Sequence, residues 1–215
     1  MKPSDPKSDV QAVIFDMDGV LARYDFHQRL QELAVLTGLT CKEIEEAVWG
    51  SGFDYAHDQG RSDPETYLRG VSALLGTEIT VSDWITARKN AMTPDFEVLS
   101  LVKALQPSVK RATLTNNGAL LHEAIDLVFP EMRRLFGQHC YFSFQFGEAK
   151  PHIDVYFGVL EKLGVQADNS LFVDDTDWCV EGARKAGLQV HHFRGAAGLQ
   201  ADLASRGLLS FDGHL

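Results

Sequence analysis

Three short apolar stretches of this sequence each end in polar residues, and this repeated arrangement restricts the fold more than any other feature. The stretches are VIFDMD (residues 13–18), RATLTNN (111–117) and SLFVDD (170–175). Consecutive apolar residues indicate strands that are buried on both faces, as in the middle of a parallel sheet. Ligands bind at the carboxyl ends of such strands, so we expect the three polar ends to form one site.

Segments with helical spacing lie between these strands. PHIDVYFGVLEKLG (151–164) begins with a proline, which suits the first turn of a helix, and ends with a glycine. WCVEGARKAG (178–187) is a second such segment, while YFSFQF (141–146) and LQVHHF (188–193) are further predicted strands. Strands that alternate with helices of this length imply right-handed crossovers, and therefore an α/β fold with a parallel sheet.

Residues 22–93 follow a different pattern, with helical spacing and no predicted strand. Thr40 and Glu43 have the spacing of a capping box, and Pro64 suits the start of another helix. The predicted helices are 26–37, 41–50, 64–75 and 82–92. We therefore predict an α/β core formed by residues 1–21 and 94–215, interrupted by a helical insertion of residues 22–93.

Four carboxylates stand at two of the three strand ends. They are Asp16, Asp18, Asp174 and Asp175. Acids so close repel one another, and a cation or a chemical task usually offsets the repulsion. Carboxylate oxygens are ligands that Mg²⁺ prefers, together with water and phosphate oxygens. With the hydroxyl of Thr115 and the ammonium of Lys150 as phosphate-binding groups, the set suits phosphoryl transfer.

Four short motifs, in this order along the chain, resemble those of the haloacid dehalogenase superfamily of hydrolases. They are FDMDGVL (15–21), LTN (114–116), KP (150–151) and VDDTDWCVEGARKAG (173–187). Each motif falls at a predicted strand end or helix start. The resemblance implies a Rossmann-like parallel-sheet core, and it places a helical cap of the C1 type at the insertion between the first two motifs.

The resemblance also implies catalytic and metal-binding roles. Asp16 would be the nucleophile that forms an aspartyl-phosphate, and Asp18 would be the general acid/base. Asp16 and the backbone carbonyl of Asp18 would bind Mg²⁺, and Asp174 with Asp175 would complete the metal site.

Thr115, Asn116 and Lys150 would hold the phosphoryl group, again by resemblance. The cap and the segment DDTDWCVEGA are most similar to sugar-1-phosphate phosphatases, close to those that act on α-D-glucose-1-phosphate. The chain departs from that branch in having KPHI where KPDP is frequent, and Cys179 where asparagine is frequent. The implied activity is a Mg²⁺-dependent phosphoric monoester hydrolase acting on a small phosphorylated metabolite, with a sugar phosphate as the favoured substrate.

Three other functions on the same core stay open at this point. A sugar phosphomutase of the β-phosphoglucomutase type would return the phosphoryl group to the sugar, although ARYDFHQRL (22–30) lacks the histidine-then-tryptophan pattern of those enzymes. A 2-haloacid dehalogenase would need no acid for the leaving halide, so Asp18 argues against it. A catalytically idle binding protein would not require the complete set of acids.

Two segments of the insertion are candidates for contact with the substrate. YAHDQGRSD (55–63) contains Tyr55, His57, Asp58 and Arg61, and the alternative for it is a polar loop. Arg23 and Tyr24 follow the first motif, where the family has a mobile flap at the hinge of the cap.

Composition and charge restrict the partners. The formal net charge of −10 argues against a nucleic-acid binder, and no apolar run approaches the length of about 20 residues that spans a bilayer. The expected partner is a small phosphorylated molecule, and no sequence feature specifies an oligomeric state. The three cysteines form no CxxC pair, which indicates reduced thiols and a cytoplasmic location, and the N-terminus shows no apolar signal region.

Overall fold

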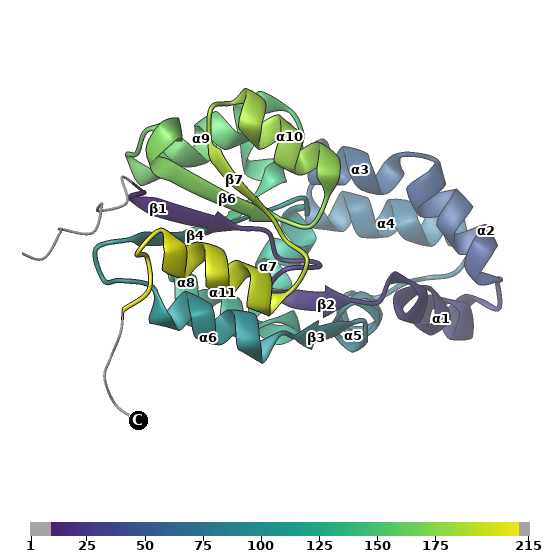
Figure 1. The fold of residues 1–215 in the computed structure, drawn as a ribbon. Coiled ribbons are helices and arrows are strands. Elements are labelled where there is room, and N and C mark those ends of the chain that lie inside the picture. Colours follow the sequence, from purple (N-terminus) through teal and green to yellow (C-terminus); the bar gives the residue numbers. More distant parts are fainter. Residues whose placement is uncertain (1–9, 211–215) are drawn as a thin grey trace, which may run out of the picture.

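Strand β1 (Ala12–Phe15) lies at the centre of a five-stranded sheet (Figure 1). The structure is a computed structural model that describes residues 10–210 of the chain. The strand order is β5-β4-β1-β6-β7, and every neighbouring pair is parallel. The other four strands are β4 (Lys110–Thr115), β5 (Cys140–Phe142), β6 (Ser170–Asp174) and β7 (Gln189–His192). The predicted α/β fold with a parallel sheet is confirmed.

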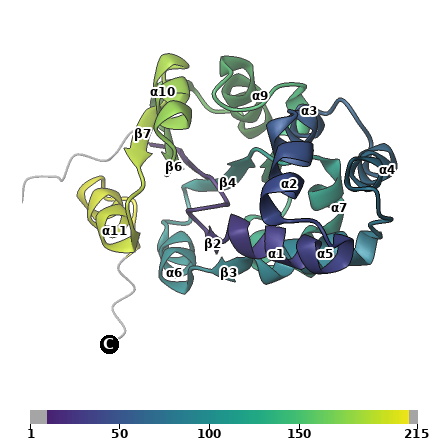
Figure 2. The ribbon, with the colours of Figure 1, turned by 90° about the vertical axis from the view of Figure 1, so that its right-hand side faces the viewer.

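Helices cover both faces of the sheet because alternate residues of each buried strand point to opposite sides. Ala12 and Ile14 pack with α9 and α10, whereas Val13 and Phe15 pack with α6, α7, α8 and α11. Figure 2 shows α9 and α10 on one side and α6 and α11 on the other. The helices are α6 (Phe96–Ala104), α7 (Ala119–Val128), α8 (Glu131–Phe136), α9 (Ile153–Leu163), α10 (Asp177–Lys185) and α11 (Ala196–Ser205).

Five further α-helices stand beyond the carboxyl ends of the strands, at the right of Figure 1. They are α1 (Phe26–Thr37), α2 (Cys41–Glu45), α3 (Phe53–Asp58), α4 (Pro64–Leu75) and α5 (Val81–Asn90), with a π-helical segment at Glu46–Gly50. Two connections join this part to the rest, and they pair as the short antiparallel strands β2 (Ala22–Tyr24) and β3 (Met92–Pro94). The helical insertion therefore stands over the edge of the sheet at which a ligand is expected, while its exact bounds, 22–93, stay a prediction.

Local signals in the insertion set the helix ends as predicted. The Thr40 hydroxyl accepts from the Glu43 amide while the Glu43 carboxylate accepts from the Thr40 amide, so the capping box is confirmed. Asp63 caps the helix that begins at Pro64, since its carboxylate accepts from the Thr66 amide. No helix among residues 10–210 is long and apolar enough to cross a membrane.

Some predicted elements were wrong in detail. The helix predicted to reach residue 92 ends at Asn90, and the two strands at the ends of the insertion were not predicted. Each of these strands has three residues, which is too short for an alternating pattern to be visible. Of YFSFQF, Tyr141 and Phe142 belong to β5, while 143–146 form a 3₁₀ helix. Helices α3, α7, α8 and α11 were also absent from the prediction.

Candidate active site

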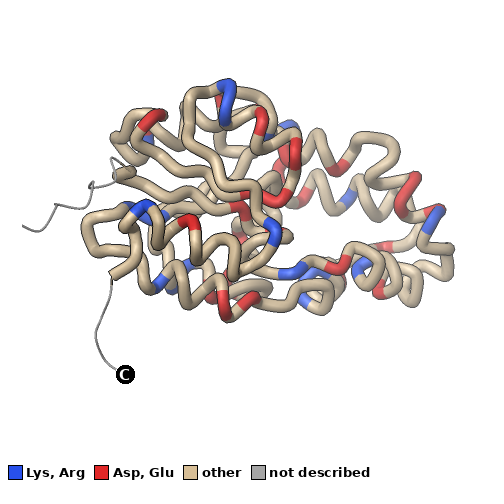
Figure 3. Tube along the Cα trace, viewed as in Figure 1, with Lys and Arg blue, Asp and Glu red and all other residues tan. Residues whose placement is uncertain are grey.

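The carboxyl ends of β1 and β6 bring three acids together. Asp16 follows β1 directly, and Asp174 and Asp175 lie at the end of β6, where acidic segments gather in Figure 3. One carboxylate oxygen from each of the three lies within 4.8 Å of the others. The Lys150 ammonium stands between two of them, with its Nζ 2.8 Å from Asp16 Oδ1 and 2.7 Å from Asp174 Oδ2.

Burial controls the charge state of this cluster. It raises the pKa of Asp16 to about 8, an effect that Lys150 opposes and that Asp174 reinforces. Burial also raises the pKa of Asp175, with Asp174 adding to the effect. Burial alone would lower the pKa of Lys150, but Asp16 and Asp174 hold it well above its ordinary value. One buried ammonium thus faces three acids, and a divalent cation bound by hard carboxylate oxygens would complete the charge balance.

A glycine allows the two acidic segments to approach each other. Gly19 has a φ of +86°, which favours glycine, and a Cβ placed there would lie 2.4 Å from Asp175 Oδ2. The turn after β1 can therefore pass against Asp175 only with glycine at this position.

The end of β4 supplies the neutral polar groups. The buried Thr115 hydroxyl accepts a hydrogen bond from the Asn117 amide at 2.7 Å. The Asn116 side chain binds the backbone of Lys150 twice, accepting from its N–H at 2.8 Å and donating to its carbonyl at 2.9 Å. Asn116 therefore holds Lys150 in place, and one N–H of its side-chain amide and its backbone N–H are left as donors for a phosphoryl group.

The Asp18 carboxylate lies outside the three-acid cluster. It is bound by Arg88 Nη2 from helix α5, at 2.8 Å from Oδ1 and 2.6 Å from Oδ2, and it also accepts from Asn117 at 3.2 Å. Asp18 is therefore shared between the sheet and the helical insertion.

Two cavities meet at Asp18 and Asn116, which line both. The inner cavity, of about 230 Å³, is lined by acids, phosphate-binding candidates and the start of α10. Besides Asp18 and Asn116, its lining residues are Asp16, Thr115, Lys150, Asp175, Thr176, Trp178 and Cys179. The outer cavity, of about 280 Å³, lies between the sheet edge and the insertion. Its other lining residues are Tyr24, Phe26, Arg29, Trp49, Asp54, Asp58, Arg88 and Asn117. The inner cavity is therefore polar and suits a charged group, and the outer cavity beside it has both aromatic and charged side chains.

The six candidates predicted in the insertion have different locations. Tyr24 and Asp58 line the outer cavity, and burial raises the pKa of Asp58 well above its ordinary value. Arg23, on β2, is exposed, as are Tyr55 and Arg61, and none of the three lines either cavity. The sixth candidate, His57, is buried against the α/β core.

His57 connects the insertion to the first turn of α7. Its Nε2 accepts from the Leu120 amide at 3.3 Å, and its Nδ1 lies 2.9 Å from the Ser62 hydroxyl. A Cβ at Gly118 would lie 2.0 Å from His57 Cδ2, so glycine is required for this approach. The Nε2 contact thus docks the insertion against the core, while Nδ1 is held by Ser62 within the insertion itself.

The pH dependence of stability should report this docking. Burial lowers the pKa of His57 below 6.5, so the unfolded chain binds the proton more tightly. Neutral His57 therefore contributes to the free energy of unfolding, and this contribution is fully present above pH 6.5. It is lost as the pH falls toward the folded-state pKa, by up to about 1.4 kcal/mol for each pH unit. In His57→Gln, the decline in unfolding free energy between pH 7 and 5 should be shallower. Exposed His27→Gln is the control, and equal slopes in all three proteins would contradict the docking role.

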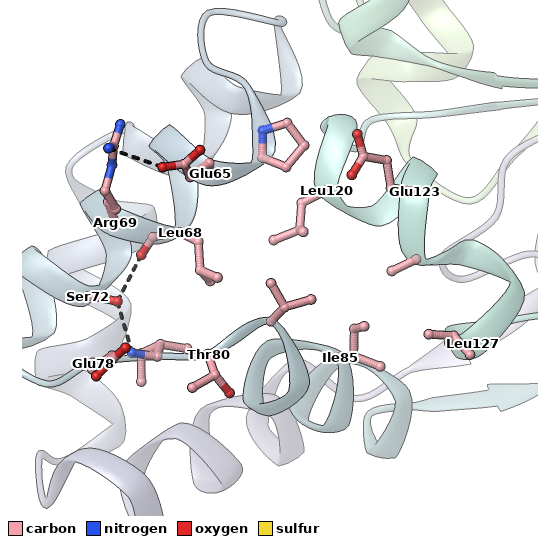
Figure 4. A pocket seen from close by; sticks show the side chains of 14 residues that line it. Glu65, Leu68, Arg69, Ser72, Glu78, Thr80, Ile85, Leu120, Glu123 and Leu127 are labelled. Atoms are coloured by element: carbon pink, nitrogen blue, oxygen red, sulfur yellow. Dashed lines mark hydrogen bonds and ion pairs between the residues drawn. The ribbon is translucent and has the colours of Figure 1, made fainter.

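A larger cavity lies apart from the acids. It has a volume of about 700 Å³, and its apolar walls include Leu68 on α4, Ile85 on α5 and Leu120 on α7 (Figure 4). Figure 4 shows these side chains facing one another from the insertion and from α7. It contains none of the residues of the acidic cluster, so it is not the candidate active site.

The parallel sheet, with clustered acids and a buried lysine at the carboxyl ends of its strands, places the chain in the class of α/β proteins with a Rossmann-like core. The chain belongs to the haloacid dehalogenase-like hydrolase family, whose model matches residues 10–187. It is 30% identical to Phosphatase MT3486 of Mycobacterium tuberculosis over 204 residues, which is 85% of this chain and 86% of that protein. The superfamily predicted from the four motifs is confirmed.

Two solved structures share the fold. One is a haloacid dehalogenase family enzyme from Bacteroides thetaiotaomicron in complex with magnesium and inorganic phosphate, with a TM-score of 0.74, 18% identity and coverage of 86% of this chain and 94% of that chain. The other is L-2-haloacid dehalogenase from Xanthobacter autotrophicus with chloropropionic acid covalently bound. Its TM-score is 0.63 and its identity 21%, and the match covers 94% of this chain and 85% of that chain. At these identities the likeness concerns the fold alone.

Sequence reasoning missed several residues of the site. Asn117 stands beside the predicted Asn116, and a polar residue at the end of a strand could have been included on that ground. Arg88, Arg29 and Trp49 carry no such signal, because they reach the site through the packing of helices far from the strand ends.

Proposed function

We propose that this chain is a Mg²⁺-dependent phosphatase that hydrolyses a small phosphorylated metabolite, a sugar phosphate, through an aspartyl-phosphate on Asp16. The observation that carries this proposal is the contact of one buried lysine with two acids at the carboxyl ends of adjacent strands. The family and the phosphatase relative support hydrolase activity. The proposal retains the predicted roles of the site residues.

The chain's own residues can perform both half-reactions. An oxygen of Asp16 attacks phosphorus while the bond to the leaving oxygen breaks, and Asp18 gives that oxygen its proton. Water then attacks the aspartyl-phosphate, Asp18 takes a proton from it, and inorganic phosphate leaves with Asp16 regenerated. Lys150 and Thr115 hold the equatorial oxygens and stabilise their charge.

The donor set fits Mg²⁺. Asp16, Asp174 and Asp175 offer oxygens close together, and burial, with Asp174 adding to the effect, raises the pKa of Asp16, so a cation bound there would favour its ionised form. With the backbone carbonyl of Asp18, these residues would hold the ion, which when bound would neutralise the phosphoryl oxygens and favour ionised Asp16.

The outer cavity supports a compact, hydroxylated leaving group. Trp49 and Phe26 offer faces for stacking, while Asp54, Asp58 and Arg29 offer hydrogen-bond acceptors and donors. Its volume of about 280 Å³ suits a single sugar rather than a polymer. We propose that the helical insertion acts as a C1-type cap over this chamber, with the predicted sugar-1-phosphates as the first compounds to test.

A screen of phosphorylated metabolites with Mg²⁺, ranked by kcat/KM, tests this proposal. A phosphatase should release one inorganic phosphate for each sugar phosphate consumed. An isomeric sugar phosphate with little phosphate release would indicate a mutase, and turnover of 2-haloacids without phosphatase activity would indicate a dehalogenase. If none of the esters is turned over, the chain would instead be a binding protein without catalytic activity.

The three cysteines are all free thiols, which supports the proposed cytoplasmic location.

Removal of the metal should abolish activity. Chelation should stop phosphate release and added Mg²⁺ should restore it, while Ca²⁺ should substitute poorly because its looser coordination misplaces the reacting groups. Mg²⁺ should also raise the thermal midpoint of the wild type, since it binds the folded chain, and should do so less in Asp175→Asn. Full activity in excess chelator after exhaustive metal removal would rule out the metal role.

A further inference from the structure

The catalytic steps proposed above assign no role to Arg88, although it contacts Asp18. It lies on helix α5 of the insertion, its side chain is 1% exposed, and its Nη2 reaches both oxygens of Asp18, at 2.8 and 2.6 Å. The two residues are 70 positions apart in the sequence. The contact therefore joins the insertion directly to the residue proposed as the general acid/base.

The surroundings of Arg88 show that the pair is poorly explained by stability alone. Its guanidinium carbon lies 4.1 Å from the centre of the Tyr24 ring, on the strand that leads into the insertion. Nε and Nη1 are buried and have no hydrogen-bond partner among the described residues. Burying a charge with two unpaired donors is costly, and such pairs often stabilise less than apolar residues of similar size. A functional role for the charge would offset this cost.

The role of Arg88 follows from the side chains that surround the Asp18 carboxylate. Asp18 has one neighbour from the sheet side, Asn117 at 3.2 Å, and one from the insertion, Arg88. Asn117 is also bound to Thr115, so its position is set by β4. The carboxylate of Asp18 is thus oriented by two groups, one of which moves with helix α5. Its direction depends on whether the insertion is docked, and the docking contacts include those of His57.

We propose that Arg88 is the positioning residue for Asp18, and that it makes proton transfer to the leaving group depend on the docked insertion. This inference rests on the proposed phosphatase function. Arg88 is not assigned a contact with phosphorus or with the metal. Without Arg88, Asp16 can still attack phosphorus, but Asp18 is held only by Asn117 and spends less time directed at the leaving oxygen.

The dependence of the rate on the leaving group distinguishes this role from a structural one. With Mg²⁺ present, we would measure single-turnover rates for an activated aryl phosphate and for an alkyl phosphate, whose leaving oxygen needs protonation. Arg88→Met should slow the alkyl ester about 10²-fold and the aryl ester less than about tenfold. Arg88→Lys should recover part of the alkyl rate, because it keeps a positive charge near Asp18 but carries it on a shorter and more flexible side chain.

A double variant tests whether Arg88 acts through Asp18. The combined change Asp18→Asn and Arg88→Met should slow the alkyl ester no more than Asp18→Asn alone, since the acid that Arg88 positions is already absent.

Two control variants test whether losing any arginine charge, or any buried arginine, has the same effect as losing Arg88. Arg69→Met removes an exposed arginine of α4, and should leave the rates unchanged. Arg29→Met removes a buried arginine of the outer cavity that donates to the Tyr24 hydroxyl rather than to Asp18, and it should raise KM without changing the aryl-to-alkyl ratio.

The outcomes separate this inference from the proposed function. Equal slowing of both esters in Arg88→Met, or additive losses in the double variant, would overturn the positioning role while leaving the phosphatase intact. If Arg88→Met fails to fold, the same ratio measured in Arg88→Gln, which also lacks the charge, decides the question, and a wild-type ratio there would overturn the inference. A wild type that releases no phosphate from either ester would refute the proposed function itself, and this inference with it.

Discussion

Asp16→Asn is expected to slow turnover by about 10³-fold or more and to leave no covalent phosphoenzyme. An amide is a poor nucleophile, and Asp16 is the acid that stands at the end of the central strand beside Lys150. The fold should persist, because asparagine has nearly the same shape and a neutral side chain costs less to bury than a carboxylate. The measurements are steady-state phosphate release and trapping of the phosphorylated chain by rapid acid quench.

A matched variant tests whether charge removal alone has this effect. Asp126→Asn changes an acid of helix α7 that pairs with Arg133 away from the three-acid cluster, and its turnover should equal that of the wild type. Thermal unfolding of both variants would verify folding. If Asp16→Asn kept turnover within tenfold of the wild type, or still acquired covalent phosphate, another residue would have to be the nucleophile.

Lys150→Ala is expected to reduce kcat/KM by about 10²-fold or more, which corresponds to roughly 3 kcal/mol of transition-state stabilisation. The structure adds a second effect that the sequence did not predict. Lys150 is 3% exposed and contacts both Asp16 and Asp174, so its loss leaves two buried acids without their counter-charge. Loss of one partner from a buried ion pair costs about 3–5 kcal/mol of folding free energy.

Denaturant unfolding with and without Mg²⁺ separates these two effects. The stability lost in Lys150→Ala should return in part when Mg²⁺ is added, whereas the rate should stay low. Lys150→Met keeps much of the volume and should lose nearly as much activity, which would assign the effect to charge. Lys162→Met, on the exposed side of α9, is the surface control. A Lys150→Ala protein within twofold of the wild type in kcat/KM would exclude the proposed role.

In the insertion, local features such as helix caps were predictable from the sequence, whereas long-range strand pairing was not. Caps at Thr40 and Asp63 act through contacts within three residues, so they were predictable from the sequence and were found. The paired strands β2 and β3 join residues about 70 positions apart through three pairs only, and no local pattern marks such a pairing.

The acidic cluster was predictable for a different reason. In a parallel sheet the carboxyl ends of neighbouring strands share one edge, so polar residues at the ends of β1, β4 and β6 had to lie near one another. The sequence by itself therefore determined the α/β class and the gathering of Asp16, Asp174 and Asp175 near Thr115.

Only the tertiary structure decided how each side chain is used. It directs the Asn116 side chain to the backbone of Lys150, buries His57 against α7, and turns Asp18 toward Arg88. The contacts of His57 and Asp18 depend on the position of the insertion over the sheet, which follows from packing between segments far apart in the chain. Sequence periodicity records which face of a helix is buried, but it does not record which distant residue that face will meet.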